Sequence, residues 1–238
     1  KPVFVDIDIR TFNINTAAIE AAITPKTKAI IPVHEFGLAC DIQSIMSIAK
    51  KHNLYVIEDA ACALGAKQKE QFVGTFGDFG SFSLHPRKAI SSGEGGLLVS
   101  KAEGLANKIR ALRNHGIEMI NGKMEFVVPG FNYRMTDFQA ALVNSQLKRL
   151  QNILDYKQQL ANVYLKTITN PKVQLPHIPN DRNHTWQTFH VILDKSINRD
   201  KAIEKLKTAQ IGTNYGAQCM PAQQYFQKKY KLNCEQLF

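Results

Sequence analysis

Residues 27–61 read TKAIIPVHEFGLACDIQSIMSIAKKHNLYVIEDAA, and this stretch decides the fold. Apolar runs over residues 27–34 and 54–57 have the length and composition of buried strands. Between them, apolar residues recur at helical spacing after Asp41, which we expect to cap the helix; they are Ile42, Ile45, Met46 and Ala49. A strand, a helix and a second strand in this order predict a parallel, right-handed unit. We therefore expect an α/β protein with a mostly parallel sheet flanked by helices.

The sequence on either side of this stretch extends the sheet. Residues 2–8 look like a strand, and short strands are also expected over residues 80–84 and 96–99. A helix over residues 105–112 should stop near Gly116, because glycine commonly follows the last helical turn.

The second half of the chain is predicted to leave the sheet. Residues 136–139 have capping-box form and open a long amphipathic helical stretch that reaches Leu160. After Pro171 comes a loop rich in Pro and Asn, then a strand over residues 189–193 and a helix over residues 202–206. We expect residues 1–150 to be part of a large α/β domain, residues 151–170 a connecting helix, and residues 171–238 part of a smaller α+β C-terminal domain.

Composition excludes several classes of protein. The 238 residues are 44% hydrophobic and 21% charged, which is globular, and no apolar run is long enough to cross a bilayer. The formal charge of +10 is spread along the chain, so we expect a small anionic substrate and neither nucleic acid nor a membrane as partner. The four cysteines form no CxxC pair, which predicts no metal site, no disulfide framework and a cytoplasmic location; they are Cys40, Cys62, Cys219 and Cys234.

Two charged residues stand where an α/β sheet binds its ligands. Asp59 follows an apolar strand, at the carboxyl edge where ligands of such sheets lie, although a turn or cap aspartate is an equal reading. Lys88 lies between a strand of small and aromatic residues and the glycine-rich turn of residues 93–96. Most lysines are solvated surface groups, but a partly desolvated amine can react with an aldehyde cofactor.

Several motifs together resemble one family in both order and spacing. They are IEDAACALGA at residues 57–66, FGDFGSFS at 76–83, HPRK at 85–88, GEGG at 93–96, NHG at 114–116 and GFNYRMTD at 130–137. The chain resembles the DegT/DnrJ/EryC1/StrS family of sugar aminotransferases over essentially its whole length. The resemblance implies the PLP-transferase fold type I, with pyridoxal 5'-phosphate as the cofactor.

The resemblance also implies a role for each matching residue. Lys88 would hold the cofactor covalently and later carry a proton as the catalytic acid and base, while Asp59 would keep the pyridine nitrogen protonated. Ser83 would donate its hydroxyl to the phosphate. Asn132 would reach the cofactor phosphate of a neighbouring subunit, which implies a homodimer with a shared active site. Ser83 could instead be an ordinary strand serine, and Asn132 a turn residue.

The chain also departs from the family pattern. Cys62 stands where glutamine or histidine is frequent, at a position that touches the cofactor ring or its hydroxyl, and a thiol is a weaker donor. Relatives with histidine in place of Lys88 act as dehydratases, so the retained lysine favours transamination. The phosphate-binding, glycine-rich turn and the stacking aromatic residue of the family are absent before Lys1. We therefore expect an internal fragment, cut at both ends and inactive by itself.

The function expected from this resemblance is amination of a keto sugar linked to a nucleotide. Glutamate is the expected amino donor, and the product would serve polysaccharide or antibiotic sugar synthesis. The alternative is a non-enzymatic module that binds pyridoxal phosphate, or an inactive remnant of the same fold. A nicotinamide-binding domain is disfavoured because no stretch of the chain has the GxGxxG pattern.

Three histidines and one arginine near these motifs are further candidates. His34 follows a strand and could approach a substrate. For His85 and His115, packing or hydrogen bonding is favoured over proton transfer. Arg134 is a candidate for an anion contact, with a structural salt bridge equally possible.

Overall fold

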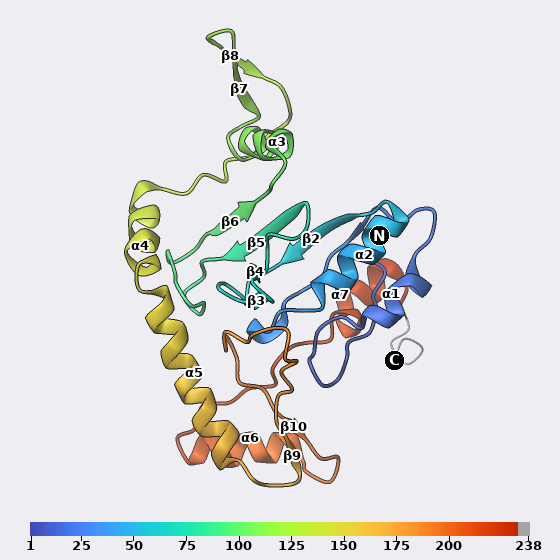
Figure 1. Cartoon of the computed structure of the whole chain (residues 1–238), viewed down its shortest axis with the longest axis vertical. Coiled ribbons are helices and arrows are strands. Elements are labelled where there is room, and N and C mark those ends of the chain that lie inside the picture. The colour runs from blue at the N-terminus through green and yellow to red at the C-terminus, as the bar shows by residue number, and fades with distance from the viewer. Residues whose placement is uncertain (233–238) are drawn as a thin grey trace.

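The centre of the molecule is a four-stranded sheet. The structure is a computed structural model that describes residues 1–232; Cys234 and the C-terminal end considered above lie outside the described residues. The strand order is β1-β2-β5-β6, with bounds Ala29–Ile30, Tyr55–Asp59, Phe79–Ser83 and Gly96–Val99. Figure 1 labels β2, β5 and β6 of this sheet. β1, β2 and β5 are parallel, and β6 is antiparallel to β5. The predicted mostly parallel α/β sheet with flanking helices is confirmed.

The helix between β1 and β2 builds the first part of the core. α2 (Ile42–His52) begins at Asp41, whose carboxylate accepts a hydrogen bond from the Ser44 N–H at 3.3 Å, as predicted for its cap. Its buried residues, Ile42, Ile45 and Ala49, pack with Ile19 of α1 (Thr16–Ala22), Ile30 and Val56. The apolar spacing that predicted the helix is therefore the face that holds it against the sheet.

Two predictions about the early strands are wrong. Residues 27–34 do not form one buried strand, because β1 has only two residues and the side chains of Ile31 and Val33 are 62% and 37% exposed. Successive side chains of an extended chain point to opposite faces, and only the face of Ile30 is covered here. Residues 2–8 contribute only the isolated bridge between Ile7 and Ile14.

Two hairpins in the middle of the chain were not predicted. The first joins β3 (Lys67–Gln68) to β4 (Gln71–Phe72). The second joins β7 (Ile117–Ile120) to β8 (Lys123–Phe126) and projects away from the sheet beyond α3 (Glu103–Arg113) in Figure 1. Its turn is Asn121-Gly122 with positive φ at both residues, and this dipeptide was a hairpin signal in the sequence.

The long helical stretch predicted from Thr136 is two helices. α4 (Asp137–Leu147) begins with the predicted capping box of Thr136 and Gln139, and α5 (Leu150–Thr167) follows after a break at residues 148–149. Figure 1 shows α5 running away from the sheet toward the lower part of the molecule. Within residues 1–232, no helix combines the length and the apolar character needed to span a membrane.

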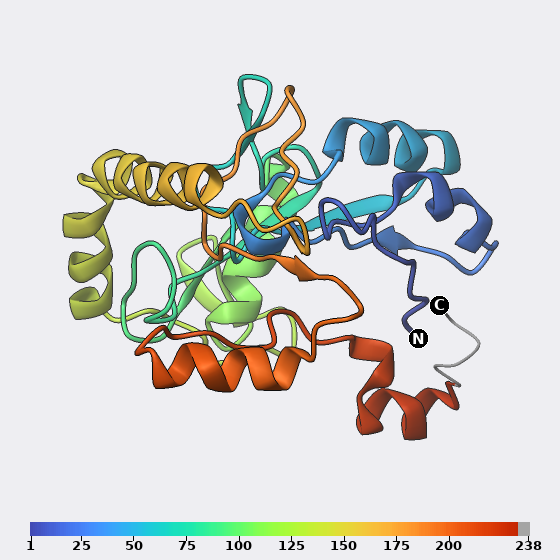
Figure 2. The ribbon, with the colours of Figure 1, turned by 90° about the horizontal axis from the view of Figure 1, so that it is seen from below.

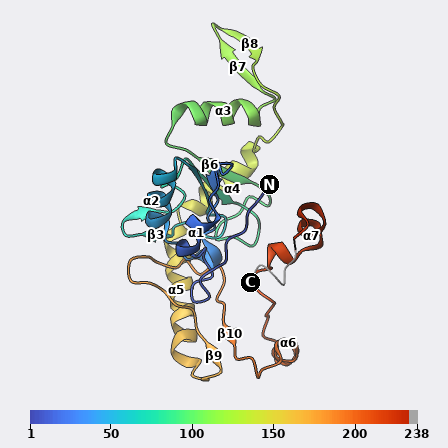
Figure 3. The same cartoon turned by 90° about the vertical axis from the view of Figure 1, so that its right-hand side faces the viewer.

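The remaining elements follow α5. They are β9 (Val173–Gln174), β10 (Ile192–Leu193), α6 (Arg199–Thr208), η2 (Met220–Ala222) and α7 (Gln224–Tyr230). The predicted strand over residues 189–193 is shorter than expected, and the predicted helix over residues 202–206 is α6. α6 and α7 lie on the side of the molecule away from α2 (Figure 2 and Figure 3). The division into domains at residues 150 and 170 stays a prediction.

One segment from the second half of the chain returns to the sheet. The Thr185 N–H donates to the Gly37 carbonyl at 2.8 Å, and the Thr188 N–H donates to the Phe36 carbonyl at 3.1 Å. Both acceptors belong to the short helix η1 (Glu35–Gly37) that follows β1. His184 and His190, which flank this segment's hydrogen bonds, are 4% and 9% exposed. Segment 184–190 therefore fixes the loop at the carboxyl edge of the sheet.

These two buried histidines should make stability depend on pH. Burial lowers the pKa of His184 to about 3 and that of His190 to about 4, from an ordinary value of 6.5. Both rings are thus neutral in the fold but take up protons below pH 6.5 when the chain unfolds, so stability is present above pH 6.5 and is lost as the pH falls. Acidification from pH 7.5 to 5.5 is expected to lower the free energy of unfolding by about 3 kcal/mol, half from each ring.

Urea denaturation at the two pH values measures this loss. His190→Phe retains an aromatic ring between Phe12 and Phe36, whose centroids lie 4.7 and 4.6 Å from that of His190, and should remove about half of the pH dependence. The exposed His177→Phe should leave it unchanged. A free energy of unfolding that is equal at both pH values would contradict the assignment.

Candidate functional site

The carboxyl ends of β2 and β5 meet at one edge of the sheet. Asp59 is the last residue of β2, and Ser83 is the last residue of β5. The two strands are parallel with Asp59 opposite Ser81, so both ends point to the same edge (Figure 1). This is the edge at which open α/β sheets bind their ligands.

A tight turn after β2 arranges two of the predicted residues. The Asp59 carboxylate accepts a hydrogen bond from the Ala61 N–H at 3.0 Å, and the Ala63 N–H donates to the Ala60 carbonyl at 2.9 Å. Ala60 and Ala63 are fully buried, so this turn is packed as well as hydrogen-bonded. Cys62, three residues after Asp59 in the sequence, lies in this turn.

Lys88 reaches this turn from the other side. Its Nζ lies 3.1 Å from Cys62 Sγ, and its side chain is half-buried. The Lys88 N–H donates to the His85 carbonyl at 2.9 Å, and the loop that carries it is anchored by Leu84 and Ile90, which are 0% and 2% exposed. The structure thus brings together Lys88, Cys62 and Asp59 from segments that are far apart in the sequence.

Glu35 also lies near this cluster, although the sequence motifs did not indicate it. The His34 N–H donates to the Asp59 carbonyl at 2.9 Å, so the residue that follows His34 begins beside Asp59. Burial raises the pKa of the Glu35 carboxyl and the charge of Asp59 raises it further, while the Phe36 N–H and the charge of Lys88 act in the opposite sense. A carboxylic side chain that ends an apolar strand was the available signal, as it was for Asp59.

A second missed residue lies beneath the site. Glu58 is fully buried, and its carboxylate accepts hydrogen bonds from the N–H groups of Gly74, Phe76 and Gly77 at 2.7 to 2.8 Å. His34 Nε2 donates to it at 3.0 Å, while His34 Nδ1 accepts from the Cys40 N–H at 3.1 Å. Burial alone would raise the pKa of Glu58, but these hydrogen bonds outweigh burial and lower it.

The placement of His34 corrects one expectation. His34 is 0% exposed and both of its ring nitrogens are engaged, so it does not approach a substrate. Its ring instead ties Glu58 to the backbone of Cys40. The strand alternation explains this orientation, because His34 shares the covered face with Ile30 and Pro32.

Ser83 and Asn132 are less closely tied to the cluster. Ser83 Oγ accepts a hydrogen bond from the His85 N–H at 3.3 Å, at the start of the loop that carries Lys88. Asn132 is exposed, and its side chain accepts from Arg134 Nε at 2.9 Å. No contact recorded among residues 1–232 joins Asn132 to Lys88, Asp59 or Cys62 of the same chain. In the described part of the chain Arg134 also makes no ion pair, which disfavours the structural salt bridge.

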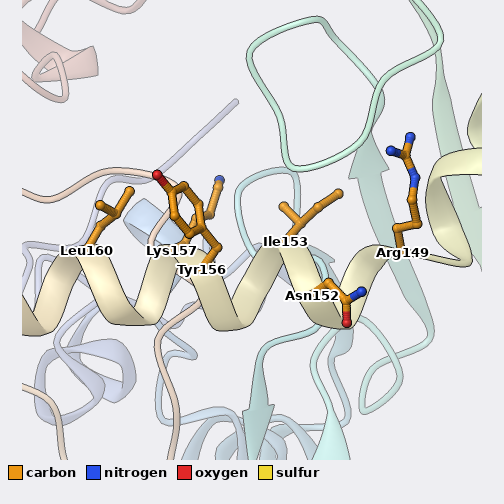
Figure 4. A pocket seen from close by; sticks show the side chains of 6 residues that line it. All are labelled: Arg149, Asn152, Ile153, Tyr156, Lys157 and Leu160. Atoms are coloured by element: carbon orange, nitrogen blue, oxygen red, sulfur yellow. The ribbon is translucent and has the colours of Figure 1, made fainter.

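A hollow in the surface lies away from this cluster, on α5. It has a volume of about 440 Å³ (Figure 4), and all six of its lining residues come from this helix and the residue before it. They are Arg149, Asn152, Ile153, Tyr156, Lys157 and Leu160. Burial lowers the pKa of Lys157. The part of the chain that the structure describes contains no group of three or more potential metal ligands.

A comparison with protein families decides what kind of protein this is. Residues 1–237 match the DegT/DnrJ/EryC1/StrS aminotransferase family. The chain belongs to this family. The resemblance seen in the motifs around Asp59 and Lys88 is thereby confirmed, and the members of this DegT-type family use pyridoxal phosphate.

Relatives of known sequence show how much of a family member the chain covers. It is 42% identical over 227 residues to the uncharacterized protein MJ1066 of Methanocaldococcus jannaschii, with 90% of this chain and 59% of that protein covered. It is 40% identical over 209 residues to the GDP-perosamine synthase of Caulobacter vibrioides, with 86% and 56% covered. The chain therefore spans less than two thirds of the length of these DegT-family relatives.

Solved structures confirm the fold. PseC of Helicobacter pylori, an aminotransferase involved in pseudaminic acid biosynthesis, has a TM-score of 0.93 at 26% identity, with 100% of this chain and 65% of that chain covered. The pyridoxal phosphate form of Spr1654 from Streptococcus pneumoniae, named as a sugar aminotransferase, has a TM-score of 0.88 at 27% identity, with 96% and 64% covered. The predicted architecture of a DegT-type aminotransferase is thus correct.

The clustered residues fit the family's cofactor chemically. An aldehyde needs an amine, which Lys88 offers in a half-buried position. A protonated pyridine nitrogen needs a carboxylate, and the Asp59 carboxylate accepts a hydrogen bond from the Ala61 N–H, which leaves acceptor capacity on its other oxygen. A phosphate needs hydroxyl or N–H donors, and the Ser83 hydroxyl lies at the end of the neighbouring strand.

Proposed function

We propose that the protein containing this chain transfers an amino group to a keto sugar linked to a nucleotide, with pyridoxal phosphate as its cofactor and glutamate as amino donor. The product would be an amino sugar for polysaccharide or antibiotic sugar synthesis. The main support for the proposal is the position of Lys88 beside Cys62, on the turn that follows Asp59 at the carboxyl edge of the parallel strands. Membership of an aminotransferase family supports it.

Each residue has a role that its position allows. Bound pyridoxal phosphate supplies an aldehyde that reacts with amines and a ring that withdraws electrons from the reacting carbon. Lys88 Nζ anchors the cofactor and, when released, moves a proton at the same nitrogen. The Asp59 carboxylate would keep the pyridine nitrogen of the cofactor protonated. Ser83 would donate to the phosphate, and Cys62 would touch the cofactor ring or its hydroxyl.

The sugar substrate is inferred from the relatives. One of them is named GDP-perosamine synthase and another belongs to pseudaminic acid biosynthesis, so the relatives act in amino sugar synthesis. By analogy, we infer that the substrate of the present protein is a keto sugar linked to a nucleotide. Its negative charge suits the formal charge of +10.

We also propose that two copies share the active site, in the cytoplasm. Asn132 is exposed and would donate its amide to the cofactor phosphate of the partner subunit. Apolar side chains around it are strongly exposed, which favours burial against a second copy; they include Phe126 at 72%, Phe131 at 57%, Tyr133 at 73% and Phe138 at 86%. The described cysteines are unpaired, as expected in a reducing compartment.

The proposed function is tested by following 2-oxoglutarate release from glutamate. The full-length protein saturated with pyridoxal phosphate should release one equivalent per subunit without a sugar, and many equivalents once a suitable nucleotide keto sugar is added. If no amino donor yields its corresponding oxo acid, the result would instead favour the non-enzymatic binding module.

Asp59→Asn should separate catalysis from binding in the same assay. The amide has the shape of the carboxylate but not its charge, so the rate of amino transfer is expected to fall by about 10²-fold or more. The exposed Asp200→Asn is the matched control and should retain the parent rate. An Asp59→Asn protein that works at the parent rate would remove Asp59 from the proposed mechanism.

A further inference from the structure

We propose that the Cys62 thiol positions the amine of Lys88, and that the nearby Glu35 carboxylate balances its charge, whenever that amine is not linked to the cofactor. The inference rests on the proposed function, in which Lys88 is released once in each half of the reaction. It assigns a positioning role to Cys62 and an electrostatic role to Glu35, a residue outside the sequence motifs.

The contact between Lys88 and Cys62 is direct. Lys88 Nζ lies 3.1 Å from Cys62 Sγ, well within the range of a hydrogen bond to sulfur. Among residues 1–232, this is the one hydrogen bond recorded for the amine, and no carboxylate oxygen lies within 4.0 Å of it. Sulfur is a weak acceptor, so the thiol holds the amine in place without binding it as firmly as an ion pair would.

Glu35 supplies a negative charge near the Lys88 amine. Its carboxylate is half-buried and close enough to interact electrostatically with both Lys88 and Asp59. The hydrogen bond recorded for that carboxylate in the described chain comes from the N–H of the next residue, Phe36, at 3.3 Å. A carboxylate with so little local hydrogen bonding retains acceptor capacity for a nearby ammonium group.

The backbone of Glu35 is fixed on both sides. The Glu35 N–H donates to the side chain of the buried Asn13 at 2.8 Å, and its neighbour Phe36 adopts a φ of 56°, in the left-handed region. The Phe36 carbonyl accepts from the Thr188 N–H, so segment 184–190 holds this strained residue. Strain that surrounding contacts maintain is frequent at functional sites.

Charge balance explains why both residues are needed. A free lysine side chain populates many rotamers, and the contact with Cys62 selects one of them. Asp59 would be paired with the cofactor ring, so Glu35 remains as the carboxylate that balances a free Lys88 ammonium. The Cys62 thiol thus determines the position of the Lys88 amine. The Glu35 carboxylate stabilises the positive charge of that amine.

Competitive labelling of lysines in the cofactor-free, full-length protein tests this proposal. A trace of acetic anhydride reacts with uncharged, accessible amines, and peptide mass spectrometry gives the rate for each lysine. In Glu35→Gln, which keeps the shape of the side chain and removes its charge, Lys88 should be labelled about fivefold faster. Cys62→Ala should give a similar increase, and Cys62→Ser should restore slow labelling because a hydroxyl can accept from the amine.

The controls separate this role from loosened structure. Glu70→Gln removes an exposed carboxylate 3.9 Å from Lys67 Nζ, and Cys219→Ala removes an exposed thiol; neither should change the labelling of Lys88. Lysines other than Lys88 should keep their parent rates in Glu35→Gln. If Lys88 is labelled at the parent rate in every Glu35 or Cys62 variant that keeps the parent melting temperature, the proposal is wrong. Because no cofactor is present, this outcome is independent of whether the protein is an aminotransferase.

Discussion

Lys88→Ala is expected to lower the rate of amino transfer by about 10³-fold or more. Two functions of one nitrogen are lost together in this variant, the covalent anchor and the carrier of the transferred proton. The fold should persist, because the side chain is only half-buried and its recorded contact is a weak hydrogen bond to Cys62. Release of 2-oxoglutarate from glutamate, in the presence of a nucleotide keto sugar, measures the loss in the full-length protein.

Two further variants make the Lys88 result specific. Lys88→Arg keeps the positive charge but cannot form the link, so it should be as inactive as Lys88→Ala. Lys101→Ala removes an exposed lysine before α3 and should keep the parent rate. A Lys88→Ala protein with a tenth or more of the parent activity would show that another amine carries out the reaction.

Glu58→Ala should have the largest effect on stability, lowering the free energy of unfolding by about 4 kcal/mol. The substitution leaves three backbone N–H groups and the ring of His34 without their acceptor in a buried place. Each unsatisfied buried donor costs about 1 to 3 kcal/mol. The loss of stability from several such donors together therefore exceeds the loss from any single hydrogen bond. Urea denaturation with an unchanged slope measures the difference.

Glu70→Ala is the matched control for Glu58→Ala. Its carboxylate is 99% exposed and lies 3.9 Å from Lys67 Nζ, a separation at which a surface ion pair contributes little. Its free energy of unfolding should stay within about 0.5 kcal/mol of the parent value. Equal destabilisation in the two variants would mean that the hydrogen bonds to Glu58 do not hold the loop of residues 74–77.

The sheet could be predicted from the sequence where local patterns and burial agree. The helical spacing after Asp41 and the capping box at Thr136 depend on neighbouring residues alone, and both features are present. The strand over residues 27–34 failed because an apolar composition does not tell how many faces are covered, and Ile31 is 62% exposed. The break between α4 and α5 was missed since apolar spacing continues across residues 148–149.

Only part of the candidate site could be predicted from the sequence. Asp59 and Lys88 stand in motifs that resemble one family, and the structure brings Lys88 to Cys62 on the turn after Asp59. Glu35 and Glu58 were missed because their roles come from contacts across the fold, such as those with Gly74 and Gly77 for Glu58. The catalytic roles of Lys88 and Asp59, and those of Cys62, Ser83 and Asn132 toward the cofactor, stay predictions.

The central claim, that Lys88 carries the cofactor, is tested most directly by borohydride reduction and peptide mapping. The full-length protein is saturated with pyridoxal phosphate, reduced and digested, and the modified lysine is located by mass spectrometry. We predict one stable adduct per subunit, on the peptide that contains Lys88, and none on that peptide in Lys88→Arg. An adduct on another lysine, or no adduct at all, would contradict the account.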